Sequence, residues 1–341
     1  MSSILVTGGA GYIGSHLCMA LVEKGYKVYS IDSFINSQRK IFEIINSKYG
    51  LNSIFYLESD IRYINQIEDI FKLASSHGTP IKSVIHCAGL KSVSESFINP
   101  IKYWDFNVLG SINLFKVMEE FNCENIVFSS SATVYGNEYD YPIKEEFERN
   151  PISVYGKTKL TVENILSNLF YSKNNNWKIA ILRYFNPIGS HKSGLLGESA
   201  KNNNNLFPKI CDVAAGKRSI LEIYGCDWPT FDGTPIRDYI HIMDLIDAHI
   251  KSLELLIKEK SQILNLNLGS GKGTSVIELI RSFEGANNIK INFTYKKRRN
   301  GDVPFLSASI KKAKKIINWE PKRSLNQMCE DGWKWYLKNL S

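Results

Sequence analysis

The stretch LVTGGAGYIGSH, residues 5–16, decides the fold class. An apolar run suited to a buried strand leads into Gly8, Gly9, Gly11 and Gly14, and a helix-like segment, 14–25, follows. Glycines in such a turn let backbone N–H groups approach a pyrophosphate at the N-terminus of the helix. The match is weak when taken alone, because glycine-rich turns between strands and helices also serve packing.

The next strand strengthens the interpretation. KVYSID, residues 27–32, ends in Asp32, which supplies the acid that the dinucleotide fingerprint requires after its second strand. That carboxylate can accept hydrogen bonds from both hydroxyls of a ribose and would repel a 2′-phosphate, so the pattern favours NAD over NADP. The alternatives are a flavin, a nucleotide bound in another way, or a loop that has lost its ligand.

The first half of the chain continues to alternate strands and helices. Further strands are expected at 53–60, 82–89, 125–131 and 178–186, with helices near 63–76, 94–121 and 153–173. This alternation predicts an α/β fold with a Rossmann-type, doubly wound parallel sheet. We therefore expect an NAD-binding domain over 1–184 and a smaller C-terminal substrate-binding lobe over 185–341. The strand predicted at 263–269 is expected to rejoin the first sheet.

After residue 184 the pattern becomes irregular. The stretches 201–207 and 225–235 are interpreted as loops of a loop-rich lobe. Two basic runs, 296–302 and 310–316, account for much of the net charge of +8, and the second has the pattern of a helix with a solvent-facing side. No aromatic-interleaved basic stripe accompanies them, so we expect no nucleic-acid partner.

Composition narrows the cellular context. No run approaches the roughly 20 apolar residues that cross a bilayer, so no membrane partner is expected. MSSILVTGG lacks the regions of a signal peptide, which indicates a cytoplasmic protein. The 6 cysteines are scattered without a CxxC pair, so buried reduced thiols are expected and no metal site.

Three further segments suggest carbonyl chemistry at the carboxyl edge of the sheet. FSSSATVYG (128–136) brings serines to one strand tip, HCAGLKSV (86–93) brings Gly89 and Lys91 to another, and SVYGKTKLTVE (153–163) places Tyr155 and Lys159 one helical turn apart. A tyrosine has a pKa of about 10, and each unit of lowering requires about 1.4 kcal/mol. An ammonium and an oxidised nicotinamide can supply this together, so Tyr155 could take a hydroxyl proton. Taken singly, the serines could cap a helix, Lys91 could be a surface charge, and the Tyr–Lys spacing could arise by chance.

The motifs TGGAGYIGSH, HCAGLKSVSES, FSSSATVYG, SVYGKTKLTVE, LRYFNPIGSH and DGTPIRDYIHIMDL closely resemble the extended short-chain dehydrogenase/reductase family. More narrowly, they resemble its UDP-galactose (UDP-glucose) 4-epimerases, in order, from residue 3 to about residue 335. Related sugar-nucleotide dehydratases carry an acidic pair before VYG, where this chain has Ala132 and Thr133. Elimination would lack its proton donor here.

The resemblance implies an isomerase of carbohydrate metabolism. It would epimerise C4 of UDP-glucose and UDP-galactose reversibly, through transient NAD-dependent oxidation to a 4-keto sugar. The alternatives are a 4-epimerase that prefers UDP-N-acetylhexosamines or UDP-uronates, and a non-catalytic NAD-binding regulator. Leu306 occupies the position that limits pocket size in the family, and it leaves the use of UDP-GlcNAc open. A homodimer is implied, with helices 94–121 and 153–173 in the contact.

The resemblance also assigns residues to roles. The catalytic set is Tyr155, Lys159 and Ser131. The NAD-binding set is Gly8, Gly11, Tyr12, Ile13, Gly14, Asp32, Asn36, Ser37, Asp60, Ile61, Cys87, Ala88, Gly89, Lys91, Asn107, Ser129, Tyr155, Lys159 and Phe185. The substrate-binding set is Lys91, Ser131, Thr133, Tyr155, Asn186, Asn205, Leu206, Ile223, Tyr224, Arg237, Arg299 and Asp302. Asn205 is aligned through a shortened, more polar segment, ESAKNNN (198–204). Arg237 could instead form a local ion pair with Asp238, and Arg299 could be a solvated surface charge.

Overall fold

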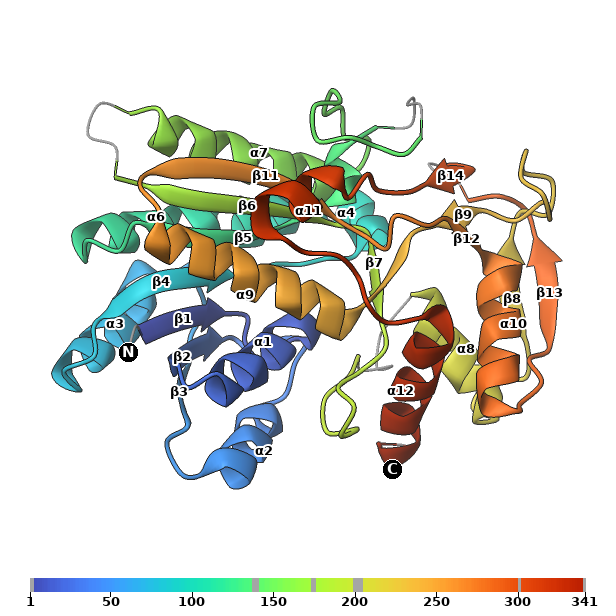
Figure 1. The fold of residues 1–341 in the computed structure, drawn as a ribbon, viewed down its shortest axis with the longest axis horizontal. Coiled ribbons are helices and arrows are strands. Elements are labelled where there is room, and N and C mark those ends of the chain that lie inside the picture. Colours follow the sequence, from blue (N-terminus) through green and yellow to red (C-terminus); the bar gives the residue numbers. More distant parts are fainter. Residues whose placement is uncertain (1–2, 137–140, 173–175, 199–204, 300–301, 340–341) are drawn as a thin grey trace. The chain divides into compact units, whose positions relative to one another are not determined.

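The computed structural model describes residues 3–136, 141–172, 176–198, 205–299 and 302–339 (Figure 1). The chain divides into two compact units. Unit 1 contains Met1–Gly136, Glu148–Arg183 and Ala248–Leu266, and unit 2 contains Asn137–Phe147, Tyr184–Asp247 and Asn267–Ser341. Each unit is thus assembled from segments that are far apart in the sequence.

Unit 1 is built on a parallel sheet. Within the described residues, seven strands lie in the order β11-β6-β5-β4-β1-β2-β3, and parallel pairs run from β3 through β2, β1 and β4 to β5. The strands are β1 Ser3–Thr7, β2 Lys27–Asp32, β3 Ile54–Glu58, β4 Ile81–His86, β5 Asn125–Ser131, β6 Lys178–Tyr184 and β11 Gln262–Leu268. The predicted Rossmann-type fold is confirmed. The chain order reverses between β1 and β4, which is where such sheets bind ligands at their carboxyl edge.

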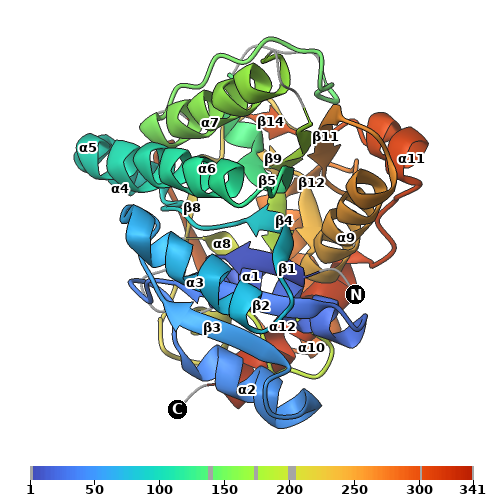
Figure 2. The same cartoon turned by 90° about the vertical axis from the view of Figure 1, so that its left-hand side faces the viewer.

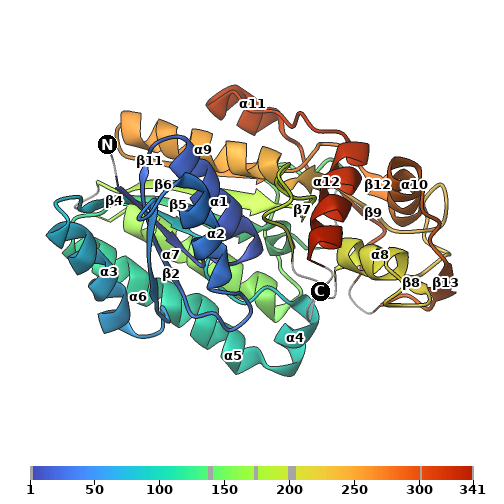
Figure 3. The same cartoon turned by 90° about the horizontal axis from the view of Figure 1, so that it is seen from below.

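Helices cover both faces of this sheet. Figures 2 and 3 show α3, α6 and α7 on one face and α1 and α9 on the other. The helices are α1 Tyr12–Glu23, α2 Lys40–Tyr49, α3 Ile64–Ser76, α4 Val93–Ile98, α5 Pro100–Trp104, α6 Gly110–Glu120, α7 Val154–Phe170 and α9 Ile242–Lys258. A core cluster joins strand residues such as Leu5 and Phe128 to Ile70 of α3, Leu114 of α6 and Leu166 of α7. Burying each such side chain contributes about 1.5–3 kcal/mol.

The single helix expected over 94–121 is wrong in one respect. The segment consists of α4, α5, a π-helical turn η1 (Asp105–Leu109) and α6. Pro100 begins α5, since proline lacks the N–H that would continue the helical bonding from α4. The π turn contains Asn107, one of the predicted NAD-binding residues. A wide turn of this kind often lies at a functional site.

Unit 2 is richer in helices than the sequence indicated. Its described part contains α8 Leu206–Ala214, α10 Val276–Asn287, α11 Lys311–Ile317 and α12 Leu325–Lys338, with short strands β7 Asn186–Ile188, β8 Leu221–Tyr224, β9 Ile236–Arg237, β10 Tyr239–His241, β12 Thr274–Ser275, β13 Phe293–Lys296 and β14 Phe305–Leu306. The predicted loop 225–235 and the helix predicted over 310–316 are both present, whereas α8 begins within the predicted loop 201–207 and α10 and α12 had not been predicted. Part of the predicted loop 201–207, residues 201–204, lies outside the described residues.

A separate hydrophobic core holds unit 2. Phe283 of α10 packs edge-on against Trp333 of α12 at 5.7 Å between ring centroids, and Trp333 stacks on Tyr336 at 5.6 Å. Helix α10 begins with a capping box in which Ser275 and Glu278 bond each other's backbone N–H groups.

Two expectations from composition are tested by the structure. Among the described residues, no helix has both the length and the apolar content that a membrane span requires. Cys18, Cys123, Cys211 and Cys329 are buried free thiols, as expected. Cys226 is exposed, which contradicts the expectation for that residue.

Candidate active site

The glycine-rich loop after β1 forms a cradle that only glycine allows. Gly8 has φ +68°, and a Cβ there would lie 2.8 Å from the backbone of Ala88. A Cβ on Gly14 would lie 2.1 Å from the carbonyl oxygen of Gly8. Helix α1 begins after Gly11 without a side-chain cap, so its first turn, which includes Tyr12 and Ile13, presents backbone donors at a helix N-terminus. The loop therefore fits a dinucleotide pyrophosphate.

Asp32 lies at the tip of β2 and organises the neighbouring loops. Its Oδ2 accepts from the N–H of Ala10 at 2.9 Å, while Oδ1 accepts from the N–H of Phe34 at 2.9 Å and from Oγ of Ser37 at 2.7 Å. Asn36 is exposed in the same loop. An ionised carboxylate can only accept hydrogen bonds, and the remaining lone pairs of Asp32 suit the hydroxyl donors of a ribose.

Asp60 follows β3 and is held by an arginine that the sequence reasoning missed. Arg62 forms a fork with Asp60, with distances of 3.0 Å from Nε and 2.6 Å from NH2 to Oδ2, and it also bonds Asp105 at 2.7 Å. Burial opposes ionisation of Asp60, but the hydrogen bonds from Arg62 lower its pKa overall. Asp60 therefore stays an acceptor, next to buried Ile61.

The loop after β4 is fixed by the π turn. Asn107 accepts from the N–H of Leu90 at 2.8 Å and donates to its carbonyl at 3.1 Å, and it also donates to Oγ1 of Thr158 on α7 at 3.0 Å. These bonds hold the segment 87–91, which contains the half-buried Cys87 and Ala88, the exposed Gly89 and the exposed Lys91. The role of Thr158 had not been predicted. The side chain of Asn107, predicted to bind NAD, is bonded to groups of the protein itself.

Ser131 and Tyr155 come together as expected. Oγ of Ser131 accepts from the N–H of Thr133 at 3.2 Å and from its Oγ1 at 3.0 Å. Because both bonds are donated to Ser131, its own hydroxyl proton is available to Tyr155. Burial raises the pKa of Tyr155 to about 12, and the nearby hydroxyl of Ser131 acts in the lowering direction. Thr133 lies in a short 3₁₀ turn, Ala132–Val134, directly after β5.

Lys159 lies one turn after Tyr155 on α7. Its Nζ donates to the carbonyl oxygen of Ser129 at 2.9 Å and lies 6.0 Å from the ring centroid of Tyr155. Burial lowers the pKa of Lys159 to about 8, against the opposing influence of Cys87 and Glu163. The lowered tyrosine pKa expected from the sequence is not produced by the chain alone, because burial of Tyr155 outweighs the opposing influence of Ser131.

A buried charged cluster behind these residues had not been predicted. Glu163 of α7 is bonded by Arg183 of β6, by Ser130 of β5 and by Arg149. The sequence contained a signal for it, since Arg183 interrupts the apolar strand KIAILRYFN. A charge inside a buried strand requires a partner.

In unit 2, Arg237 is held in place at the end of β9. Its NH1 donates to the carbonyls of Ile236 at 2.9 Å and Val303 at 2.8 Å, and its NH2 lies 3.4 Å from Oδ1 of Asp302. The alternative of an ion pair with Asp238 is wrong. Asp238 instead accepts from segments 270–271 and 308, and burial raises its pKa to about 6.

The predicted uracil-contacting strand and the second arginine also meet. The guanidinium of Arg299 lies 3.8 Å from the ring centroid of Tyr224 on β8, and the hydroxyl of Tyr224 donates to Glu222 at 2.9 Å. One face of the Tyr224 ring is thus taken by a cation–π contact in this structure. Ile223 lies on the same strand, and its side chain is buried.

The other predicted residues of unit 2 occupy strand and helix ends. Asn205 precedes α8 and donates to Glu198 at 2.9 Å, and Leu206 is the first residue of α8. Phe185 is buried, and Asn186 begins β7, where its N–H bonds the carbonyl of Asp238 at 2.9 Å. The sequence predicted these positions but not their protein partners.

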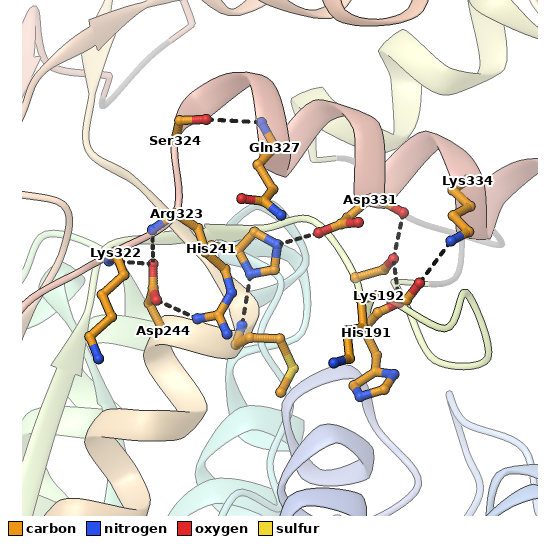
Figure 4. A network of polar contacts seen from close by, with 12 residues as sticks. His191, Lys192, His241, Asp244, Lys322, Arg323, Ser324, Gln327, Asp331 and Lys334 are labelled. Carbon is orange, nitrogen blue, oxygen red and sulfur yellow. Dashed lines mark hydrogen bonds and ion pairs between the residues drawn. The ribbon is translucent and has the colours of Figure 1, made fainter.

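Helix α12 fastens the segment that follows β7 (Figure 4). Nε2 of His241 lies 3.2 Å from Oδ2 of Asp331, Ser190 bonds the carbonyl of Asp331 at 2.5 Å, and Nζ of Lys334 bonds the carbonyl of Lys192 at 2.9 Å. Because β7 pairs with β10, these bonds also hold the strand that begins at Asn186.

Known proteins resemble the whole chain. A sequence model for a family described as GDP-mannose 4,6 dehydratase matches residues 5–332. A UDP-glucose 4-epimerase of Cyamopsis tetragonoloba is 43% identical over 340 residues, covering 99% of this chain and 95% of that protein. The chain belongs to the family of the UDP-glucose 4-epimerases.

Solved structures of UDP-glucose 4-epimerases share the fold of this chain. The enzyme of Stenotrophomonas maltophila, crystallised with NAD and formylated UDP-arabinopyranose, has a TM-score of 0.94 and 40% identity, with both chains covered to 100%. The enzyme of Bifidobacterium longum, in complex with NAD⁺ and UDP, has a TM-score of 0.92 and 38% identity, with both chains covered to 99%. These comparisons confirm the family expected from the motifs.

Proposed function

We propose that this chain catalyses the reversible epimerisation of UDP-glucose and UDP-galactose at C4. The observation that carries the proposal is that Ser131, which accepts two hydrogen bonds from Thr133, lies close enough to Tyr155 to influence its pKa, with Lys159 on the next turn, in the unit that carries the glycine cradle. Thr133 stands where elimination would need an acid. Relatives bearing the name UDP-glucose 4-epimerase support the same reaction.

The residues of unit 1 suit NAD as the cofactor. When bound, NAD supplies a hydride acceptor at the nicotinamide and a positive charge in its oxidised form. The glycine cradle would hold the pyrophosphate, Asp32 the adenosine ribose and Asp60 the adenine. Lys159 would reach the second ribose, and its hydrogen bond to Ser129 fixes the direction of its ammonium.

Proton movement at the sugar is assigned to Tyr155. Its phenolate takes the proton of the 4-hydroxyl, and after the 4-keto sugar has turned its other face toward the cofactor site, the same group returns the proton to the keto oxygen. Ser131 holds that oxygen, since two donated bonds from Thr133 leave its own proton free to point toward substrate or Tyr155. No net oxidation results, because the 4-keto sugar is reduced in the same cycle.

The UDP portion is assigned to unit 2. Arg237 and Arg299 would neutralise the diphosphate through charge-assisted hydrogen bonds. Asp302, which already contacts Arg237, would accept from the uridine ribose, and Ile223 and Tyr224 would contact uracil. Asn186, Asn205 and Leu206 would line the sugar and diphosphate. Arg299 would have to leave the Tyr224 ring if uracil stacks on that face.

A substrate panel tests the proposal. Purified protein is incubated with UDP-galactose, UDP-GalNAc and UDP-galacturonate without added oxidant, and the products are separated by ion-pair chromatography. We expect UDP-glucose from the first substrate with the highest kcat/KM. Conversion restricted to either other substrate would replace the proposed specificity, and no conversion of any of the three would overturn the proposal.

We further propose a cytoplasmic homodimer. An exposed thiol such as Cys226 stays reduced in the cytosol. Helices α4 and α5 pack on α7, and this region exposes Phe97, Ile98, Ile101 and Ile152 at 54, 77, 77 and 45%. Patches of this kind mark interaction surfaces. Sedimentation velocity should show a dimer that Ile98→Glu with Ile101→Glu converts to a monomer; a wild-type monomer at micromolar concentration would reject the assignment.

A further inference from the structure

A fully buried ion pair links three elements of unit 1 behind the catalytic residues. Glu163 and Arg183 are 0 and 2% exposed. Oε1 of Glu163 accepts from Oγ of Ser130 at 2.6 Å and from Nε of Arg183 at 3.0 Å, while Oε2 accepts from NH2 of Arg183 at 2.8 Å and from NH1 of Arg149 at 3.1 Å. Every donor is directed at one carboxylate.

A buried charged cluster stabilises a core little compared with apolar packing. Desolvation of two buried charges offsets most of their attraction, and well-packed apolar residues often stabilise a fold as well. The neighbouring core positions of α7, Val162 and Leu166, are in fact apolar. A directional bond set therefore points to a requirement for defined positions beyond that for stability.

The elements that the cluster joins carry the reacting groups. Glu163 lies one helical turn after Lys159 and two after Tyr155 on α7. Ser130 lies on β5 between Ser129, whose carbonyl accepts a hydrogen bond from the ammonium of Lys159, and Ser131, which acts to lower the pKa of Tyr155.

Arg183 secures the same tip from the adjacent strand. It is on β6, next to β5 in the sheet. Its NH1 donates to the hydroxyl of Tyr135 at 2.7 Å, and its guanidinium lies 5.1 Å from the centroid of that ring. Tyr135 directly follows the 3₁₀ turn that contains Thr133.

We infer that Glu163 is a positioning residue for the epimerisation, acting through Ser130. Its carboxylate ties the tip of β5 to α7, and this tie sets the bond from Lys159 to Ser129 and the position of Ser131 beside Tyr155. The inference rests on the proposed function, because it concerns the geometry of the same reaction.

The test removes the tie to β5 but leaves the charges paired. Ser130→Ala deletes the bond from β5 while Glu163 keeps Arg183 and Arg149. The matched control, Arg149→Gln, deletes the one donor to Glu163 whose side chain is 36% exposed, and it leaves Ser130 bonded. Ser130→Thr retains the hydroxyl.

We expect Ser130→Ala to lower kcat by about 10- to 100-fold with KM for UDP-galactose within about 3-fold, as small displacements of reacting groups do. Arg149→Gln and Ser130→Thr should stay within about 3-fold of wild-type kcat. A purely structural role would instead lower the unfolding midpoint of Ser130→Ala and leave the kcat of its folded fraction unchanged, which would overturn the inference.

A second measurement does not depend on turnover. In the purified wild-type protein and the variants, the titration of Lys159 is followed by NMR of ε-¹³C-lysine and assigned with Lys159→Met. We expect the pKa of Lys159 to fall in Ser130→Ala, since its ammonium loses a fixed acceptor, and to change little in Arg149→Gln. If the wild type epimerises no UDP-hexose, the proposed function fails and this titration alone decides; identical titrations in wild type and Ser130→Ala would reject the positioning role.

Discussion

Replacing Lys159 by methionine should alter the pH dependence of stability in a direction that its burial dictates. Lys159 is 5% exposed, and burial lowers its pKa from 10.5 to about 8. Because each tenfold change in proton affinity corresponds to about 1.4 kcal/mol, burying the ammonium costs the fold about 3 kcal/mol below pH 8.

The sign follows from the protons bound in each state. Between pH 8 and 10.5 the unfolded chain holds a proton on Lys159 and the folded chain does not, so wild-type stability rises with pH in this window. Lys159→Met has no such titration. It also loses the bond to the carbonyl of Ser129, but this loss is nearly independent of pH. The stability of wild type minus that of the variant should therefore rise by about 3 kcal/mol from pH 7 to pH 10.5.

Urea unfolding of the two nucleotide-free proteins, followed by tryptophan fluorescence at several pH values, measures this difference. The titrations of groups remote from Lys159 cancel between the two proteins, and the two groups whose pKa Lys159 lowers, Cys87 and His86, titrate in the wild type near 11 and 3, outside this window. If the free-energy difference between wild type and variant stays constant across the window, the pKa of Lys159 is the same in the folded and unfolded chain. If the difference falls, the fold raises the pKa of Lys159, and burial does not dominate it. The variant should also have lost its epimerase activity, so the wild type keeps a costly buried charge for the reaction.

Four further predictions concern individual contacts. Tyr155→Phe should lower kcat more than about 100-fold without weakening NAD binding, as expected for a lost acid–base group; retained turnover would remove Tyr155 from proton transfer. Thr133→Val keeps the backbone donor to the active-site serine but not the hydroxyl, so kcat should fall about 2- to 10-fold, the value of one neutral hydrogen bond; an unchanged kcat would show that the hydroxyl is dispensable. Gly14→Ala would place a Cβ 2.1 Å from a loop carbonyl and should weaken NAD binding about 100-fold by fluorescence titration, whereas Gly285→Ala, where a Cβ meets nothing within 4 Å, should leave binding unchanged and stabilise α10 by roughly 0.5–1 kcal/mol. Arg237→Lys loses the planar fork and should raise the inhibition constant of UDP about 10-fold with kcat nearly constant, so an unaltered constant would argue against a diphosphate contact.

The sequence determined the architecture of unit 1 because the relevant signals are local. Strand periodicity, the glycine turn at 8–14 and Asp32 each depend on residues close in the chain, and together they specify a parallel sheet with a dinucleotide edge. The spacing of Tyr155 and Lys159 is also local, since one helical turn fixes it. Helices α8, α10 and α12 of unit 2 escaped prediction because strands of two to four residues and irregular segments separate them.

Only the tertiary structure decided which partners each functional group has. Asn107 proved to be bonded to Leu90 and Thr158, and Asp238 to segments far along the chain instead of to adjacent Arg237. The direction in which burial shifts the pKa of Tyr155 likewise depends on what covers the ring. A buried carboxylate such as Glu163 gathers donors from separate strands, and sequence spacing contains no information on which donors these are. The sequence by itself thus determined the fold of unit 1 and the residues proposed for catalysis, whereas their bonds and charges arise from contacts between distant segments.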